Sequence, residues 1–326
     1  MKQLDIVIPC YNEKDNIRTI YGAIADVMQE AENVSFSVIY IDDGSSDDTM
    51  AEILALESEY GCAKVKYISF SRNFGKESAI YAGLQASSGD YAVLMDADHQ
   101  DPPALLPAML AVLTRRESGE DCVAVRRIDR KGEPIARSWF ANRFYALMNK
   151  FSDVKMEPGA RDFRMMTAQM RDSILALSER ERFSKGLFAW VGFKTKWLEL
   201  PNVPRAAGET KWSFWGLFKY ALSGIVAFTT APLRIASFAG VLTVLMAIIY
   251  AAYRLIRWQA LFTTDAIIIF IVLFFSGVTV SFLGIIGEYI ARIYREVKQR
   301  PVYIIAKSNI KVKMVDRRMD SGIKPE

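Results

Sequence analysis

The chain has 326 residues, enough for two ordinary domains or for one domain with appendages. Its net charge of +4 is too small to indicate a nucleic-acid-binding protein, and its three cysteines indicate neither a disulfide framework nor a zinc cluster. Hydrophobic residues make up 51% of the sequence, which is high for a soluble protein, so the position of the apolar excess along the chain matters.

The first 125 residues alternate between strand-like and helix-like segments, as βαβ units do. We therefore expect an α/β fold with a doubly wound, mainly parallel sheet. Ligands of such sheets bind at the carboxyl ends of the strands. The expected strands are residues 4–9, 36–41, 65–70, 91–95 and 122–125, and the expected helices are residues 16–32, 48–60, 76–87 and 103–115.

The first three strands end in polar loops that face the same crevice. They are residues 9–13, the loop that begins at Asp42, and residues 72–76. A carboxylate such as Asp42 can accept hydrogen bonds from a base or a ribose hydroxyl, whereas residues 45–47 are expected to form an ordinary turn and helix cap. Residues 72–76 open a helix, where amide donors and cations can meet phosphate.

An acidic motif follows the fourth strand. The apolar run of residues 91–95 ends in Asp96, Asp98 and Asp101. Burying ionised carboxylates is costly without compensation, so this strand end is expected to hold a cation. If the chain is extended here, Asp96, Asp98 and Gln100 point to one side, and their hard oxygen ligands suit Mg²⁺ or Mn²⁺. A solvated acidic turn is the alternative.

The second part of the chain is predicted to contain membrane-associated segments. Residues 126–210 are less regular, with a helix expected at 135–151 and a loop at 157–162. Residues 213–229 are aromatic on several sides and are expected to form a helix in the headgroup layer, with a core helix of the globular domain as the alternative. Two runs without a charged residue are each long enough to cross a bilayer: residues 235–253 and 266–286.

Charges around the two spans predict a hairpin with both chain ends in the cytosol. Basic residues precede the first span and follow the second, while the loop between them has only Arg254, Arg257 and Asp265. The chain opens on a strand-sized run and not on a signal segment, so we expect the globular part to stay cytosolic. The expected organisation is a globular domain at 1–210, a juxtamembrane helix region at 211–233, a hairpin at 234–291 and a basic tail at 292–326.

Several blocks of sequence resemble the signatures of family-2 glycosyltransferases, which have the GT-A nucleotide-diphospho-sugar transferase fold. They are Val7-Ile-Pro-Cys-Tyr-Asn-Glu13, Asp42-Asp-Gly-Ser-Ser46, Arg72-Asn-Phe-Gly75 and Asp96-Ala-Asp98-x-Gln100-x-Pro-Pro103. Later blocks resemble the polyprenyl-phosphate glycosyltransferases, a group with dolichol-phosphate mannose synthase and the bactoprenol glucosyltransferases. These blocks are Asp162-Phe-Arg164, Gly186-Leu-Phe-Ala-Trp-Val-Gly-Phe193, Gly208-Glu-Thr-Lys-Trp212 and Pro232-Leu-Arg234.

The resemblance implies a role for each matching residue. Asp98, Asp162 and Arg164 would be catalytic, and Asp98, Gln100 and Asp96 would serve the metal. At Arg161 the chain departs from the family pattern, which has a small residue there. The residues implied to bind the nucleotide sugar are Pro9, Tyr11, Glu13, Asp42, Asp96 and Lys76, and those expected to bind a lipid phosphate are Arg126, Arg130, Arg205 and Lys211.

The reaction implied is inverting transfer of a sugar to a polyprenyl phosphate at the cytosolic face of a bacterial inner membrane, for cell-envelope glycan or lipid modification. UDP-glucose and undecaprenyl phosphate are the expected pair, and GDP-mannose, UDP-N-acetylglucosamine and UDP-amino-arabinose stay open as donors. Mg²⁺ or Mn²⁺ would stabilise the charge that develops on the leaving diphosphate. A phosphate monoester is largely dianionic at neutral pH, so Asp162 is expected to position it and to act as a base only weakly.

The sequence disfavours two other functions. A processive polysaccharide synthase is disfavoured because the chain lacks a Gln-x-x-Arg-Trp block and offers only two spans. A non-catalytic membrane scaffold is disfavoured by the intact acidic motif. A homo-oligomer through the transmembrane helices is compatible with small residues on the second span, namely Gly277, Ser281 and Gly284.

Overall fold

The computed structural model describes residues 1–29, 33–115, 119–128, 154–200 and 265–311, together with six single residues: Asn149, Leu233, Phe238, Leu242, Leu245 and Ile249. The chain divides into two compact units. The first holds the sheet, including the residues from 301 onward, and the second holds the long apolar helix. The two units are described separately.

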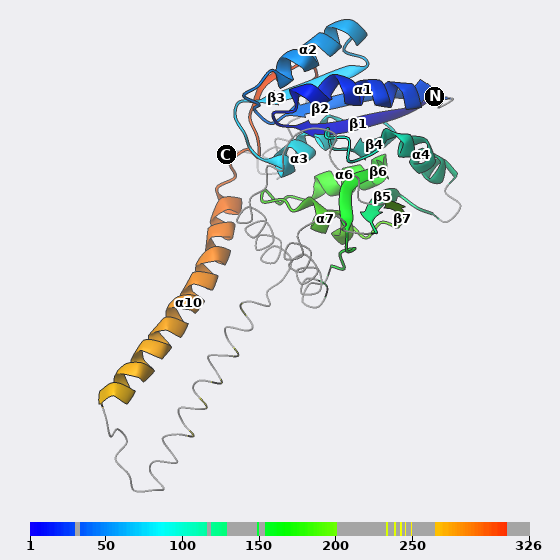
Figure 1. The fold of residues 1–326 in the computed structure, drawn as a ribbon. Helices are drawn as coiled ribbons and strands as arrows, with labels where there is room; N and C mark the ends of the chain where they lie inside the picture. Colours follow the sequence, from blue (N-terminus) through cyan, green and yellow to red (C-terminus); the bar gives the residue numbers. More distant parts are fainter. Residues whose placement is uncertain are drawn as a thin grey trace, which may run out of the picture. The chain divides into compact units, whose positions relative to one another are not determined.

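A sheet of eight strands forms the centre of the described part of the first unit (Figure 1). Its spatial order is β7-β5-β6-β4-β1-β2-β3-β8. Six strands run in one direction, and β6 and β8 run against their neighbours, so the expected mainly parallel sheet is confirmed. The strands are β1 (Lys2–Cys10), β2 (Val34–Asp42), β3 (Val65–Phe70), β4 (Tyr91–Leu94), β5 (Cys122–Arg127), β6 (Ala160–Thr167), β7 (Thr195–Leu200) and β8 (Ile305–Ser308).

Helices cover both faces of this sheet (Figure 1). Helices α1, α2 and α4 pack on one face and α3, α6 and α7 on the other. All nine elements expected in the first 125 residues are present, with ends that differ by no more than three residues. The helices are α1 (Lys14–Gln29), α2 (Thr49–Tyr60), α3 (Lys76–Ala86), α4 (Leu106–Arg115) after the 3-10 turn η1 (Pro103–Leu105), α6 (Ala168–Ala176) and α7 (Ser184–Trp190).

Strand β6 is the main difference from the expectation. Residues 157–162 were expected to form a loop, but β6 begins at Ala160 and inserts between β4 and β5. The strand carries two buried arginines, Arg161 and Arg164. Because of these charges, its sequence lacks the apolar run that would predict a buried strand. The insertion separates β5 from β4, although both run in the same direction.

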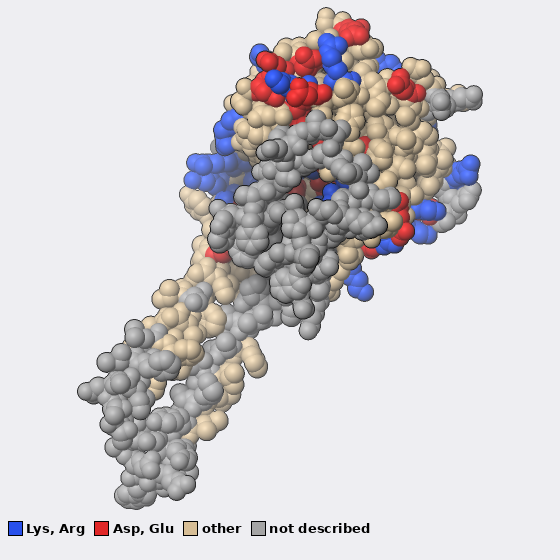
Figure 2. Space-filling model, viewed as in Figure 1, with Lys and Arg blue, Asp and Glu red and all other residues tan. Residues whose placement is uncertain are grey.

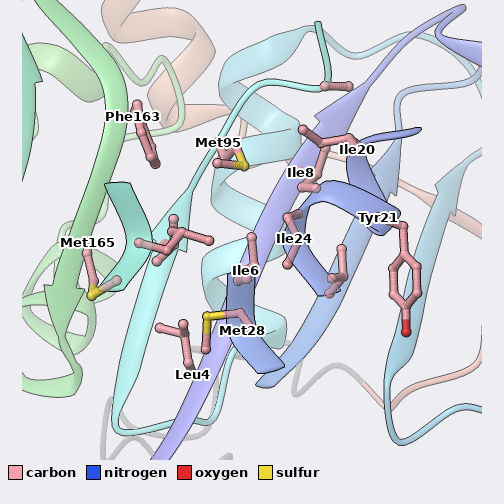
Figure 3. Packing of buried hydrophobic residues seen from close by; sticks show 14 of the residues in the cluster. Leu4, Ile6, Ile8, Ile20, Tyr21, Ile24, Met28, Met95, Phe163 and Met165 are labelled. Carbon is pink, nitrogen blue, oxygen red and sulfur yellow. The ribbon is translucent and has the colours of Figure 1, made fainter. Parts of the chain in front are cut away.

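The core follows the alternation of side chains along β1. Ile6 and Ile8 face α1 and contact the cluster that contains Ile20 and Ile24 (Figure 3). Val7, between them, belongs to the cluster on the other face with α3. Because both faces of β1 are covered, its apolar run is almost continuous.

Two helical glycines give opposite expectations for stability. A Cβ at Gly83 in α3 would lie 2.1 Å from Val7 Cγ1, whereas a Cβ at Gly22 in α1 meets nothing within 4 Å. We expect Gly83→Ala to lower the free energy of unfolding by about 1–3 kcal/mol through overpacking. Gly22→Ala is expected to raise it by about 0.5–1 kcal/mol because the helix gains a better helix former. Urea denaturation of the two variants checks the sign; equal shifts would contradict the close packing of α3 on β1.

The chain beyond residue 300 returns to the sheet as an edge strand. Strand β8 pairs antiparallel with β3. Asn309 donates to the Val65 carbonyl (3.0 Å) and accepts from the Tyr67 amide (2.8 Å), and the Tyr303 ring stacks on Phe70. The region expected as a basic tail at 292–326 therefore contributes a strand to the sheet, at residues 305–308.

Helix α10 (Asp265–Val297) contains the second expected span. By length and composition, its segment Phe274–Val297 is the one helix within the described residues that could cross a membrane. Seven of its large apolar side chains are between 43% and 67% exposed: Val272, Phe274, Val280, Leu283, Ile286, Ile290 and Ile293. Of the first expected span only Phe238, Leu242, Leu245 and Ile249 are described, and each is helical; the helices expected at 135–151 and 213–229 lie almost wholly outside the described residues.

Charged side chains of both signs lie close together at the upper end of the face shown in Figure 2. Ion pairs at the surface, such as Arg18 with Glu52 (2.7 Å) and Glu59 (3.2 Å), are screened by solvent and contribute little to stability. The stability of the first unit is therefore dominated by its two apolar clusters.

Candidate active site

The antiparallel pairing of β6 with β4 brings three predicted site residues together. Leu94 pairs with Arg164, so the continuing register places Asp162 beside Asp96 at the carboxyl end of β4. Lys76, the first residue of α3, lies between the two carboxylates. Its Nζ is 2.8 Å from Asp96 Oδ1 and 2.8 Å from Asp162 Oδ2. A cation thus neutralises two acidic residues that come from different strands.

This arrangement keeps Lys76 and Asp162 ionised. Burial alone would lower the pKa of Lys76, but Asp162 and Asp96 raise it well above its ordinary value. Burial alone would raise the pKa of Asp162, but Lys76 and Lys185 hold it well below its ordinary value. At neutral pH Asp162 is therefore a fixed negative charge and a poor proton acceptor.

The acidic motif is a turn and not an extended row. Strand β4 ends at Leu94, and His99 has a φ of +57°. The Gln100 amide donates to Asp98 Oδ1 at 3.2 Å, which closes a local turn. The chain is therefore not extended from Asp96 to Gln100, so the condition under which these side chains were expected to project to one side is not met. The positive φ breaks the two-residue alternation on which that expectation rested.

A buried ion pair between Asp101 and Arg161 stabilises this turn. Asp101 is 1% exposed; its Oδ2 accepts from the Asp96 amide (3.0 Å), and its Oδ1 lies 2.8 Å from Arg161 Nε. Burial and the nearby Asp96 raise the pKa of Asp101 to about 7, against the opposing effect of Arg161. Sequence reasoning gave Asp101 no role, although the unexpected Arg161 was a signal that this turn has a particular partner.

Arg164 is buried beneath the site. Its guanidinium lies 3.8 Å from the centroid of the Phe188 ring, and its Nη2 donates to the Arg161 carbonyl at 3.0 Å. Lys185, at the start of α7, donates to the Ala160 carbonyl at 3.1 Å. Arg164 and Lys185 therefore hold the beginning of β6 in place. The catalytic role expected of Arg164 stays a prediction.

The loops after β1, β2 and β3 are tied to one another. Asp42 accepts from the Ser45 amide (3.0 Å) and from Ser69 Oγ (2.7 Å). Asp43 accepts from the amides of Phe74 (2.6 Å) and Gly75 (2.9 Å). Asp42 thus shapes its own loop, and its contact with a nucleotide stays a prediction. The sequence alone did not indicate this role of Asp43, which joins the loop after β2 to the loop after β3.

Gly44 is required where these loops meet. It has a φ of +67°, and a Cβ on it would lie 2.4 Å from the carbonyl carbon of Arg72. Only glycine fits this close approach without strain. Gly44 therefore permits the close approach of the loops after β2 and β3.

The residues expected at the end of β1 lie at this loop junction. Tyr11 is 37% exposed. Glu13 accepts from Asn16 Nδ2 (2.7 Å), and its amide donates to Thr49 Oγ1 (2.8 Å), so it helps to begin α1. Pro9 lies in β1 and pairs with Ile41 of β2. Contacts of Pro9, Tyr11 and Glu13 with a nucleotide stay predictions.

The expected lipid-phosphate residues are only partly visible. Arg126 is paired with Glu157 and, at 2.6 Å, with Glu199, at the end of β5. A phosphate would have to compete with these two carboxylates. Arg130, Arg205 and Lys211 lie outside the described residues.

The donor set at the turn fits a divalent ion that is also bound by its substrate. Within the described residues, no group of three or more His, Cys, Asp or Glu side chains is assembled as a metal site. Mg²⁺ typically needs only one or two protein carboxylates when substrate phosphates complete its coordination. The carboxylates of Asp96 and Asp98 and the amide oxygen of Gln100 are hard donors of this kind.

Comparisons with known proteins identify the family of the chain. Residues 5–175 match the model of Glycosyl transferase family 2, and residues 231–293 match the model of the GtrB C-terminal hairpin. CsbB of Bacillus subtilis (strain 168), described provisionally as a glycosyltransferase, is 41% identical over 95% of this chain and 94% of its own. The SfII prophage-derived bactoprenol glucosyl transferase of Shigella flexneri is 36% identical over 94% of this chain and 98% of its own.

Among solved structures, glucosyl-3-phosphoglycerate synthase from Mycobacterium tuberculosis, in complex with Mn²⁺, UDP-glucose and phosphoglyceric acid, is a distant match. The TM-score is 0.46 with 19% identity, and the match covers 69% of this chain and 78% of the other. The sheet order and the family match together identify the fold as GT-A-like.

Proposed function

This chain belongs to glycosyltransferase family 2, and from that membership we propose that it transfers a sugar from a nucleotide-sugar donor to a polyprenyl phosphate. The observation that carries the proposal is the match to a bactoprenol glucosyl transferase over 94% of this chain, which includes both the sheet and the hairpin region. UDP-glucose is the proposed donor and undecaprenyl phosphate the proposed acceptor.

The residues at the carboxyl end of β4 would perform the transfer. Asp162, held ionised by Lys76, fixes a negative charge beside the reacting centre and orients the acceptor. The acceptor phosphate is itself largely dianionic at neutral pH and needs no strong base. Loops 9–13, 42–46 and 72–75, which are already fastened together, would line the nucleotide pocket, because ligands bind at this edge of such sheets.

A divalent ion is proposed at Asp98, with Asp96 and Gln100 beside it. When bound, the ion supplies positive charge to the leaving diphosphate. We propose Mg²⁺ or Mn²⁺, since the donors are oxygen atoms. Lys76 competes with such an ion for the Asp96 carboxylate, so Asp98 is the better placed of the two aspartates to hold it.

The second unit would hold the enzyme at the membrane. We propose that residues 231–293 form a two-helix membrane hairpin with α10 as its second helix, because this region matches the GtrB C-terminal hairpin and α10 is long and apolar. The sheet and both chain ends would then lie on the cytosolic side, as the charge bias predicts. We propose that the lipid phosphate is bound by four basic residues: Arg126, Arg130, Arg205 and Lys211. We also propose that the protein forms a homo-oligomer through the hairpin.

The test is sugar transfer in membranes. A panel of radiolabelled UDP- and GDP-sugars is incubated with undecaprenyl phosphate, with and without EDTA. We expect lipid-phase label from one donor, lost with EDTA and reduced at least about 100-fold in Asp98→Asn. Asp90→Asn is the matched control, because Asp90 lies just before the opposite end of β4 and its carboxylate is bound by Lys2 and Gln3, near the start of β1.

Absence of label from every donor, with folded protein present in the membranes, would overturn the proposed reaction with this acceptor. Label from GDP-mannose or another UDP-sugar would keep the reaction and change the donor. Full activity of Asp98→Asn would remove the acidic turn from the proposed metal site.

A further inference from the structure

Arg161 connects the acidic turn to the start of β6 at several points. Its Nε lies 2.8 Å from Asp101 Oδ1, and its Nη2 donates to Gln100 Oε1 at 3.4 Å. Its own carbonyl accepts from Arg164 Nη2 at 3.0 Å. Asp101 in turn accepts from the Asp96 amide at 3.0 Å. The turn with the proposed metal residues is therefore held by one side chain from the strand that carries Asp162.

The burial of Arg161 is costly and calls for a reason. The side chain is 6% exposed, and its Nη1 has no hydrogen-bond partner among the described residues. A buried donor on a charged group without a partner is destabilising. A small residue at this position would avoid that cost but would leave Asp101 buried without a counterion. Arg161 is thus better explained by what it fastens than by packing.

We propose that Arg161 is a positioning residue that fastens the turn of residues 96–101 to β6 and so fixes where Asp98 lies relative to Asp162. This inference rests on the proposed function for its consequence: the turn must be in place to bind a divalent cation together with a nucleoside diphosphate. In this proposal Arg161 has no direct contact with either ligand. It acts through Gln100 and Asp101.

Arg171 provides a matched control. It is buried to a similar degree, with 7% exposure, and its Nη1 donates to the Gly89 carbonyl at 2.8 Å. This contact lies before β4, at the end of the strand opposite to the acidic turn. Arg171→Gln therefore removes a buried guanidinium and its hydrogen bonds without touching residues 96–101.

The first measurement is hydrogen exchange of the ligand-free, full-length protein in detergent. In Arg161→Gln we expect the amides of Asp96 and Gln100 to exchange at least about 10-fold faster. Asp101, which accepts from the Asp96 amide, loses its ion pair with Arg161, and Gln100 loses the hydrogen bond that its side chain accepts from Arg161. In Arg171→Gln these two amides are expected to exchange as in the wild type. Equal protection of the turn in wild type and Arg161→Gln would overturn the proposal, and this result does not depend on any activity.

The second measurement is calorimetric binding of UDP with Mn²⁺. We expect about 10–100-fold weaker metal-dependent binding in Arg161→Gln, typical of a lost partner behind a metal ligand, and unchanged binding in Arg171→Gln. Arg161→Lys keeps a charge for Asp101 but cannot also reach Gln100, so it is expected to recover part of the loss. Binding that falls equally in both glutamine variants would reduce Arg161 to a structural role. No binding by the wild type would instead count against the proposed donor.

Discussion

Replacing Lys76 with methionine is expected to lower the rate of sugar transfer by about 100-fold or more. Methionine is similar in length and fits a partly buried site, but it leaves Asp96 and Asp162 facing each other without the cation that bridges them at 2.8 Å. Two uncompensated carboxylates repel each other and the diphosphate of the donor. Losing one such preorganised charge typically costs 10²–10³ in rate, an effect of about 3–4 kcal/mol on the barrier.

The variant set separates this role from a structural one. Lys76→Arg keeps the positive charge and can still donate to both carboxylates, so it is expected to retain more activity than Lys76→Met. Lys2→Met removes an exposed cation that pairs with Asp90 and is expected to leave the rate unchanged. Rates from saturating and limiting donor give kcat and KM, and we expect the Lys76→Met loss mainly in kcat. Wild-type kcat in Lys76→Met would contradict the role of the bridge.

The fold of the first 125 residues follows from local patterns. Apolar runs with polar ends predicted strands such as residues 65–70, because helices cover both faces of the sheet. The apolar stripe of residues 16–32 predicted α1, because that stripe packs on the sheet. Strand β6 could not be predicted in this way. Its charged residues Arg161 and Arg164 meet their buried partners only when Gln100 and Asp101, about 60 positions away, and Phe188 of α7 come into contact with the strand.

The candidate site shows the same division. The residue types of the acidic turn indicated its chemistry, but its shape depends on a positive φ at His99 that no period reveals. The bridge of Lys76 to Asp162 joins residues 86 positions apart and follows from the pairing of β6 with β4. Likewise, Asp42 reads in the sequence as a free carboxylate, whereas the structure engages it with Ser45 and Ser69. Sequence identified the participants, and the tertiary register determines their partners.

Replacing Asp5 with alanine is expected to destabilise the first unit by about 3–5 kcal/mol, the cost of removing one partner from a buried charge network. Asp5 is fully buried near the start of β1. Its carboxylate accepts from Ser37 Oγ (2.6 Å), the Ser88 amide (2.7 Å) and the Gly89 amide (2.8 Å), and it lies 3.4 Å from Lys66 Nζ. Without it, these donors are buried with no acceptor. Urea denaturation followed by tryptophan fluorescence measures the change.

The same network predicts a dependence on pH. Burial alone would raise the pKa of Asp5, but the hydrogen bonds and Lys66 lower it below its ordinary value. Its stabilisation is therefore fully present above about pH 4 and is lost as the pH falls through the lowered pKa of the folded state. The difference in unfolding free energy between wild type and Asp5→Asn should shrink over that acidic range.

Asp26→Ala, on the exposed side of α1, serves as the control and is expected to change stability by no more than about 0.5 kcal/mol at any pH. A difference between wild type and Asp5→Asn that stayed constant from neutral to strongly acidic pH would show that Asp5 stabilises the sheet by shape alone. A difference that shrinks only in acid would instead assign the effect to its charge, which fastens β1 to β2 through Ser37 and to the turn before β4 through Ser88 and Gly89.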